Sequence, residues 1–252
     1  MNEPASNQLR PSLGRNLTHG MLAVLGRAIV TGQYDGKRFP TEAELARQHA
    51  VSRSVTREAV KMLTAKGLLF ARPRQGTIVQ PTSAWNLFDT DVLHWLLERK
   101  FTLPLLRNFN ELRLAVEPMA AQLAARYATP AGKAMIAVGL ARMEGAERGD
   151  DDALNADIAF HVPILRASGN PFFAQFEKLV GTALRTSIRF TNRFKGRSSS
   201  LPAYRAVFEA IEAGDDVLAG ATTASIIEDV MFLIRQTESE GAVADRGGSL
   251  RG

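Results

Sequence analysis

Residues 41–63 limit the possible folds of this chain more than any other segment, because they encode two short helices joined by a tight turn. Thr41 is followed three residues later by Glu44, the spacing of a capping box, so a helix is predicted to begin at Thr41. Val51 and Ser52 then predict a turn and the N-cap of another helix. The inward positions of that helix are Val55, Ala59, Met62 and Leu63. Two short helices separated in this way form a helix-turn-helix.

The flanking segments complete a small α+β domain over residues 20–80, which follows a polar tail at residues 1–19. Apolar residues at helical spacing between Leu22 and Ile29 predict a first helix that ends near Gly32. After the helix-turn-helix, "LLFARPRQGTIVQP" carries β-favouring residues on both sides of "RPRQG". This pattern predicts a hairpin with a basic tip. A hairpin in that place is the wing of a winged helix-turn-helix.

The rest of the chain carries a helical pattern. After a linker at residues 81–86, residues 87–238 show no strand-like alternation and divide at turn-rich breaks into about six segments, typical of a bundle. A polar tail is expected at residues 239–252. We expect Trp85 and Trp95 to pack at the start of this helical domain. The predicted fold class is therefore an all-α domain attached to a small α+β winged helix-turn-helix domain.

Charge is distributed unevenly between the two parts. Residues 1–80 contain 12 Lys and Arg against 5 Asp and Glu, a net charge of +7, whereas residues 81–252 contain 19 and 21, a net charge of −2. A basic small domain joined to a mildly acidic larger one indicates that the small domain binds a polyanion.

Other features of the composition narrow the cellular setting. The chain has no cysteine, which excludes disulfides, thiolate metal sites and cysteine nucleophiles. Its apolar stretches are short and interrupted, and the opening "MNEPASNQLRPSLGRN" lacks the apolar core of a secretory signal. We expect a cytoplasmic protein without a membrane partner.

The second helix of the predicted helix-turn-helix carries polar residues that suit DNA. Arg53 and Arg57 lie four residues apart near its start, where the helix dipole disfavours cations unless a polyanion is close. In a helix-turn-helix this end lies in the major groove, where arginine grips guanine O6 and N7 and where Ser54 and Thr56 can reach bases or phosphates. The wing residues expected to follow the DNA backbone or enter the minor groove are Arg72, Arg74, Gln75, Gly76 and Thr77.

Such polar residues could instead only solvate an exposed helix face. The capping box, the hairpin, its basic tip and the charge of the first third all agree, however, and they favour double-stranded DNA as the partner.

The segment "FPTEAELARQHAVSRSVTREAVKMLTAKGLLFARPRQGTIV" resembles the winged helix-turn-helix of GntR-type bacterial transcription regulators. In that family the pattern is Leu-Pro-x-Glu-x-x-Leu-Ala, then Val-Ser-Arg-x-x-Val-Arg-Glu-Ala-Leu, then a Gly-rich basic wing. The resemblance implies base and phosphate contacts from Arg53, Ser54, Arg57 and the wing around Gly76. The chain departs from the pattern at Ala43, where some relatives carry a DNA-contacting arginine.

The motifs "ELRLAVEPMAAQLAA", "DIAFHVPILRASGNP" and "YRAVFEAIEAGD" resemble the helical FCD effector domain of the FadR-like branch of this family. "WNLFDTDVLHWLLE" is similar to the opening of this domain in members that control sugar-acid catabolism. The resemblance implies a ligand-responsive transcription regulator that binds operator DNA as a homodimer. It further implies a repressor that is released by a small sugar acid.

Arg113 is a candidate for binding the carboxylate of such an effector. It lies at the edge of a predicted apolar stripe and is expected to be half buried. The stripe consists of Leu105, Phe109, Leu112, Val116, Met119 and Leu123. Arg113 could be a snorkelling or salt-bridged side chain, or its planar fork could hold a carboxylate ligand.

Asp157 and His161, with Tyr204, are the other candidates for binding the effector, whose hydroxyl groups they would hold while Arg113 pairs with its carboxylate. Asp157 and His161 lie four residues apart on an apolar helix face where polar groups need partners. Such a pair can chelate a divalent metal or can be a self-satisfied hydrogen-bonded pair in a core. In metal-binding members of the branch, two more histidines join the matching Asp and His. Here those positions are Tyr204 and Ile226, so at most a weakly bound divalent metal is expected and no cofactor is required.

An enzyme is the alternative function. Asp157 and His161, with Tyr204 and Arg113 beside them, could form a metal-assisted site that acts on a sugar acid. The sequence contains no Ser/His/Asp triad, phosphate loop or complete metal set, so we assign no catalytic residue.

Overall fold

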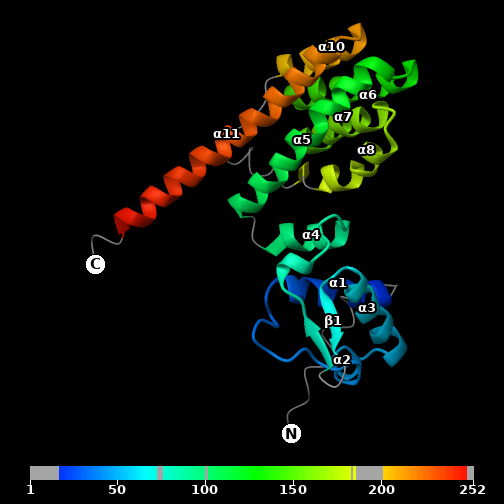
Figure 1. Cartoon of the computed structure of the whole chain (residues 1–252), viewed down its shortest axis with the longest axis vertical. Helices are drawn as coiled ribbons and strands as arrows, with labels where there is room; N and C mark the ends of the chain where they lie inside the picture. Colours follow the sequence, from blue (N-terminus) through cyan, green and yellow to red (C-terminus); the bar gives the residue numbers. More distant parts are fainter. Residues whose placement is uncertain (1–16, 73–75, 100–101, 183, 186–200, 249–252) are drawn as a thin grey trace. The chain divides into compact units, whose positions relative to one another are not determined.

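The computed structural model describes residues 17–72, 76–99, 102–182, 184–185 and 201–248. Its contacts divide the chain into two compact units, residues 1–100 and residues 101–252. Figure 1 shows both units coloured along the sequence.

The first unit contains the expected helix-turn-helix and wing (Figure 1). The two strands pair antiparallel, with Leu69 opposite Val79 and Arg72 opposite Gly76. The elements, in chain order, are α1 (Leu17–Val30), α2 (Glu42–Gln48), α3 (Arg53–Ala65), β1 (Leu69–Arg72), β2 (Gly76–Val79), a 3-10 turn (Thr82–Ala84) and α4 (Thr90–Arg99).

Both helices of the helix-turn-helix begin where the sequence predicts, and local hydrogen bonds cap their first turns. The Thr41 hydroxyl accepts from the Glu44 backbone N–H at 3.3 Å, and the Glu44 carboxylate accepts from the Thr41 N–H at 2.7 Å, which completes the capping box. The Ser52 hydroxyl caps α3 by accepting from Val55 N–H at 3.3 Å. Between the helices, Ala50 takes the left-handed backbone conformation, with φ 52°, that turns the chain.

Helix α4 packs in the first unit, which corrects the predicted domain boundary at residue 87. Trp95 is 3% exposed and lies against α1 so closely that a Cβ atom at Gly26 would be 2.2 Å from its ring. Lys66, at the end of α3, pairs with Asp89 at 2.7 Å and with Asp91 at 2.8 Å. Trp95 therefore belongs to the core of the winged helix-turn-helix.

Trp85 joins the same core, contrary to the expectation that both tryptophans pack in the helical domain. Its side chain is 8% exposed, and its indole N–H donates to the backbone oxygen of Gln80 at 3.0 Å. The first unit thus ends after α4 rather than at the wing.

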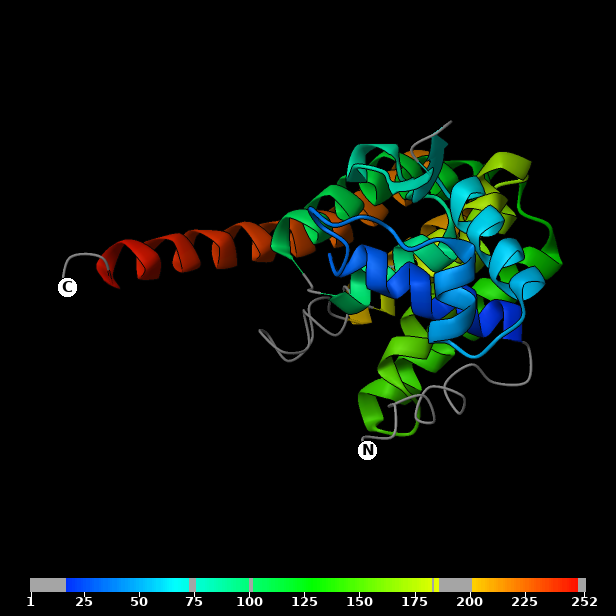
Figure 2. The same ribbon diagram turned by 90° about the horizontal axis from the view of Figure 1, so that it is seen from below.

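All the regular elements described in the second unit are helices, as predicted. In Figures 1 and 2, α11 lies along α5, and its C-terminal end extends beyond the other helices of the unit. The elements are α5 (Leu103–Tyr127), α6 (Pro130–Arg148), α7 (Ala153–Ala167), α8 (Pro171–Gln175), α10 (Leu201–Ala213) and α11 (Asp216–Gly248). Helix α11 continues as far as Gly248, into the polar tail predicted at residues 239–252.

Helix α11 is also the one described helix that is long and apolar enough to cross a membrane, over Asp216–Glu240 with a mean hydropathy of 1.7. Half of that window is buried inside the protein. Ala219, Ile227 and Ile234 are fully buried in it, and the helix packs against α5 and α10. The core helix of a bundle has the same length and composition, so these properties do not indicate a membrane span.

Candidate DNA-binding surface and effector site

Three side chains predicted to read DNA stand exposed at the start of α3. Arg53, Ser54 and Arg57 face solvent there, beside a surface hollow of about 380 Å³. The hollow brings together the loop before α2, the start of α2, the start of α3 and the first residues of β2. Its lining residues are Arg38, Phe39, Thr41, Glu42, Ala43, Arg53, Arg57, Gly76 and Thr77. The fold therefore assembles the predicted recognition helix and wing on one surface.

Arg57 forms a solvent-exposed ion pair with Glu42 on this surface. Its Nε lies 3.3 Å from Oε2 of Glu42, and both side chains are more than a third exposed. An exposed pair of this kind contributes about 0–1 kcal/mol. The pair keeps the guanidinium near the start of α3, but it is weak, so little free energy is lost when it breaks.

Thr56 was predicted to contact DNA, and the structure corrects this. It is fully buried, and its hydroxyl donates to the Ser52 backbone oxygen at 3.2 Å. It lies on the inward face of α3 with Ala59, Val60 and Leu63, at spacings of three, four and seven residues. Its hydroxyl is buried against the backbone of its own helix and is not exposed for a DNA contact.

The wing is described in part. Arg72 ends β1 and is exposed, and Gly76 begins β2 with φ 83°, a conformation that glycine adopts without strain. Thr77 lines the hollow beside Gly76. Arg74 and Gln75, also predicted to contact DNA, lie outside the described residues.

The candidate effector residues meet in the interior of the second unit. Asp157 and His161 come from α7, Tyr204 comes from α10, and Arg113 comes from α5. All four are at most 6% exposed. The Tyr204 hydroxyl donates to Oδ1 of Asp157 at 2.6 Å. The structure thus brings together all four residues that were predicted from separate stretches of sequence.

Glu117 completes this cluster and was missed by the sequence reasoning. It is 2% exposed, and its carboxylate binds both Arg113, at 2.6 Å and 3.2 Å, and Nδ1 of His161, at 2.7 Å. Asn110 adds an acceptor for Arg113 at 3.2 Å. The spacing of four between Arg113 and Glu117 is the signal that could have revealed the pair.

The position of Arg113 also differs from the prediction of a half-buried residue at the edge of a stripe. It is 3% exposed and lies in the middle of the buried face of α5, whereas Met119 of the predicted stripe is 46% exposed. The neighbouring helices determine which face of α5 is buried, because they pack against small residues such as Ala120 and Ala124. Arg113 is therefore salt-bridged, one of the two alternatives, and its fork is already held by Glu117.

Opposite charges in the cluster compensate each other. Burial favours the neutral form of Glu117, but Arg113 and His161 outweigh it and lower its pKa to about 2. Burial likewise disfavours the imidazolium of His161, but Glu117 and Asp157 raise the pKa of His161 to about 9. Burial raises the pKa of Asp157, but the nearby His161 outweighs this effect and lowers the pKa of the Asp157 carboxyl below its ordinary value. Two cations and two anions are thus buried together at neutral pH.

The residues present do not complete a metal site. The Tyr204 hydroxyl is a hydrogen-bond donor to Asp157, and Ile226, 3% exposed, offers no ligand. Nδ1 of His161 is bound by Glu117, and its Nε2 lies 3.5 Å from Oδ1 of Asp157 and makes no hydrogen bond. Among the described residues, no group of three or more His, Asp or Glu side chains is placed to hold a metal ion.

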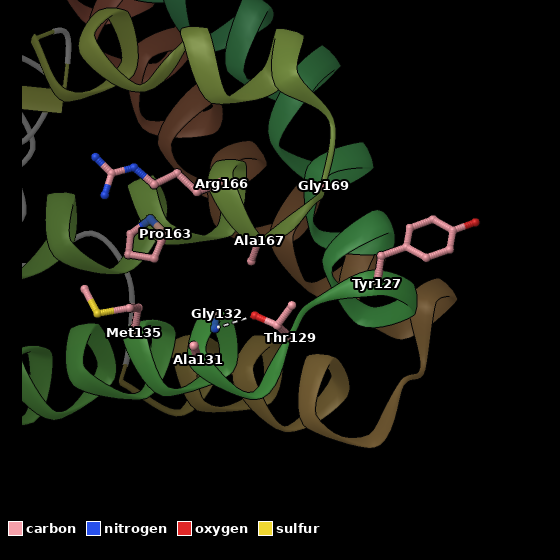
Figure 3. A pocket seen from close by; sticks show the side chains of 9 residues that line it. All are labelled: Tyr127, Thr129, Ala131, Gly132, Met135, Pro163, Arg166, Ala167 and Gly169. Atoms are coloured by element: carbon pink, nitrogen blue, oxygen red, sulfur yellow. Dashed lines mark hydrogen bonds between the residues drawn. The ribbon is translucent and has the colours of Figure 1, made fainter.

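A separate pocket of about 320 Å³ opens between the start of α6 and the end of α7 (Figure 3). Its lining residues are Tyr127, Thr129, Ala131, Gly132, Met135, Pro163, Arg166, Ala167 and Gly169. The guanidinium of Arg166 is engaged by Glu177, with Nε at 2.7 Å. None of the cluster side chains lines this pocket.

Comparison with known proteins assigns both units. Residues 22–79 match the bacterial regulatory proteins of the gntR family, and residues 109–229 match the FCD domain. The galactonate operon transcriptional repressor of Escherichia coli K12 is 35% identical over 206 residues, which cover 79% of this chain and 89% of that protein. The chain belongs to the GntR family. It is a transcription regulator with an FCD domain and not an enzyme, so the metal-assisted enzyme alternative falls.

Other relatives of this GntR-family regulator agree with the assignment. The uncharacterized HTH-type transcriptional regulator YieP of E. coli K12 is 34% identical over 204 residues, 80% of this chain and 88% of that protein. A solved structure of Lar, which controls the expression of the Listeria monocytogenes agr system, covers 88% of this chain and 98% of its own, with a TM-score of 0.55 and 19% identity. At that identity it supports the fold alone.

Proposed function

We propose that this GntR-family regulator is a cytoplasmic repressor of a sugar-acid catabolic operon, that it binds its operator as a homodimer, and that a small sugar acid releases it. In this proposal, release from the operator by the sugar acid does not require a metal ion. The observation that carries it is the buried polar cluster of Arg113, Glu117, Asp157, His161 and Tyr204 in the interior of the second unit. A full-length relative is named a repressor of the galactonate operon.

The geometry suggests a division of roles within the cluster. His161 is protonated at neutral pH, with a pKa of about 9; Glu117 holds its Nδ1, and its Nε2 lies 3.5 Å from Oδ1 of Asp157. Nε2–H is the donor that a ligand carboxylate would engage, in exchange for this longer contact with Asp157. Arg113, whose fork is held by Glu117, acts as a positioning residue that keeps His161 oriented through that carboxylate.

Asp157 and Tyr204 are the groups suited to sugar hydroxyls. The Asp157 carboxylate accepts hydrogen bonds, and the Tyr204 hydroxyl can both donate and accept. As an anion, Asp157 repels a ligand carboxylate, so it favours a pose in which hydroxyls face it and the carboxylate faces His161. A hydroxy acid satisfies both ends of the cluster, whereas a neutral sugar satisfies only one.

Release of operator DNA in a gel-shift assay tests this function. The full-length protein is bound to a DNA site selected from a random library, then titrated with galactonate, gluconate and the neutral sugar galactose. We expect release by an aldonic acid, no release by galactose, and an unchanged response in EDTA. No release by any acid in a broad panel, at concentrations up to millimolar, would sink the proposal.

Two variants then test whether the acid binds at the buried cluster. Tyr204→Phe and His161→Gln are expected to weaken the acid response at least tenfold while DNA affinity stays near that of the wild type. Tyr127→Phe, at an exposed tyrosine outside the cluster, is the matched control. If the cluster variants are folded and respond to the acid as the wild type does, the effector site lies elsewhere.

A further inference from the structure

We infer that Arg38, in the loop between α1 and α2, is a further DNA-contacting residue and binds a backbone phosphate of the operator beside the bases that α3 reads. This inference rests on the DNA-binding surface and does not depend on the effector. Arg38 was not among the residues predicted from the sequence, because it lies in a loop outside the helix-turn-helix and the wing.

Its place in the fold is the first reason. Arg38 lines the same 380 Å³ hollow as Arg53 and Arg57, together with the wing residues Gly76 and Thr77. It also lines a neighbouring hollow of about 450 Å³ between the loop and β2. Arg38 therefore stands between two hollows on the surface that carries the recognition helix and the wing.

The charge of this surface is the second reason. Ala43 lines the hollow with a single methyl group, so the start of α2 supplies no cation there. Arg38 supplies one from the adjoining loop, and Lys37, also exposed, precedes it. With Arg53 and Arg57, the surface holds three guanidinium groups around one hollow, an arrangement suited to a phosphate backbone.

The contacts that Arg38 makes within the protein leave it available. Its side chain is 67% exposed, and its Nη2 lies 2.7 Å from Oε1 of Glu44. The other carboxylate oxygen of Glu44, Oε2, accepts from the Thr41 N–H and hydroxyl, so the capping box does not need Arg38. An exposed pair is readily exchanged for a phosphate.

The salt dependence of binding tests this inference. Full-length wild type and Arg38→Ala are titrated onto a selected operator duplex and onto a random duplex across a KCl series, with fluorescence anisotropy as the readout. Loss of one phosphate contact is expected to reduce the slope of log K against log salt by about 1 and to weaken binding to both duplexes by about tenfold. Arg38→Lys is expected to keep most of the slope.

Two controls separate a contact from a general loss of charge. Arg47→Ala removes an exposed arginine of α2 that lines neither hollow, and it is expected to leave the slope unchanged. Glu44→Gln keeps a capping residue and releases Arg38 from its anion, so DNA binding is expected to strengthen. If Arg38→Ala has the affinity and slope of the wild type, or if Arg47→Ala changes the slope as much, the inference is overturned.

Discussion

At the scale of single residues, the recognition helix and the buried cluster use arginine in opposite ways. Arg57 is exposed and paired weakly with Glu42, so DNA can replace its partner. Arg113 is buried and paired at 2.6 Å with Glu117, so removing either partner leaves an uncompensated charge in the core. In the proposed function the first arginine binds DNA, and the second orients its neighbours.

Neighbouring positions on α3 should therefore differ sharply in DNA binding. Arg57→Ala and Arg53→Ala are each expected to cost about 1–3 kcal/mol of specific operator binding if the side chain grips a guanine. Thr56→Val, at a buried position whose hydroxyl bonds to the helix start, is expected to leave operator affinity unchanged. Anisotropy titrations on operator and random duplexes measure the difference. An equal loss of affinity for both duplexes would show that the arginines contact phosphates and do not read bases.

The buried imidazole predicts how stability depends on pH. The pKa of His161 is about 9 in the folded protein, against 6.5 for an unperturbed histidine. Because the folded pKa is the higher one, the stabilisation is fully present below pH 6.5 and is lost as the pH rises toward 9. We expect the free energy of unfolding to fall by up to about 3 kcal/mol across this window.

Urea unfolding at pH 6.5 and pH 9 measures this fall. His161→Gln lacks the titrating group and is expected to lose most of the pH dependence in that range, although the variant is less stable throughout because Glu117 keeps only Arg113 as its cation. A variant whose stability falls with pH as steeply as that of the wild type would show that another group titrates there.

At the scale of elements, α4 illustrates that a helix can follow a domain in sequence and still belong to its core. It packs on α1 through Trp95, and Lys66 of the first unit pairs with Asp89 just before it. The wing is therefore followed by one more structural helix before the effector domain begins.

Gly26→Ala tests the packing of α4 on α1. The added methyl group would lie 2.2 Å from the Trp95 ring, so we expect destabilisation of about 1–3 kcal/mol. Hydrogen exchange should accelerate in residues 17–97 and stay unchanged in residues 103–240. Gly181→Ala, whose methyl group would have its nearest neighbour at an ordinary 3.7 Å, is the control. Faster exchange confined to the second unit would contradict the assignment of α4.

At the scale of the whole molecule, the proposed function requires two copies. A repressor that reads DNA through one short recognition helix gains affinity and specificity when a two-fold dimer presents two such helices to paired half-sites. We expect light scattering at micromolar concentration to give a dimer, and footprints to cover a short palindrome. A monomer that protects a single half-site would exclude this arrangement.

Sequence alone determined the parts of this protein whose signals are local. The capping box at Thr41 and Glu44, the N-cap at Ser52 and the basic hairpin around "RPRQG" each lie within a few residues, and each predicted its element correctly. A helix start or a turn depends on nearby backbone and side-chain hydrogen bonds, so its residues can be recognised in a short stretch.

Tertiary structure decided the features that join distant residues. Glu117 binds His161, 44 positions further along the chain, and Tyr204 reaches Asp157 across 47 positions, so no single stretch of sequence contains these pairs. The apolar pattern of α4 suits either domain, and only its packing shows which core it completes. Periodicity indicates that a helix has an apolar face, but the partner helix selects which residues are buried, and this choice placed Arg113 at the centre of the cluster.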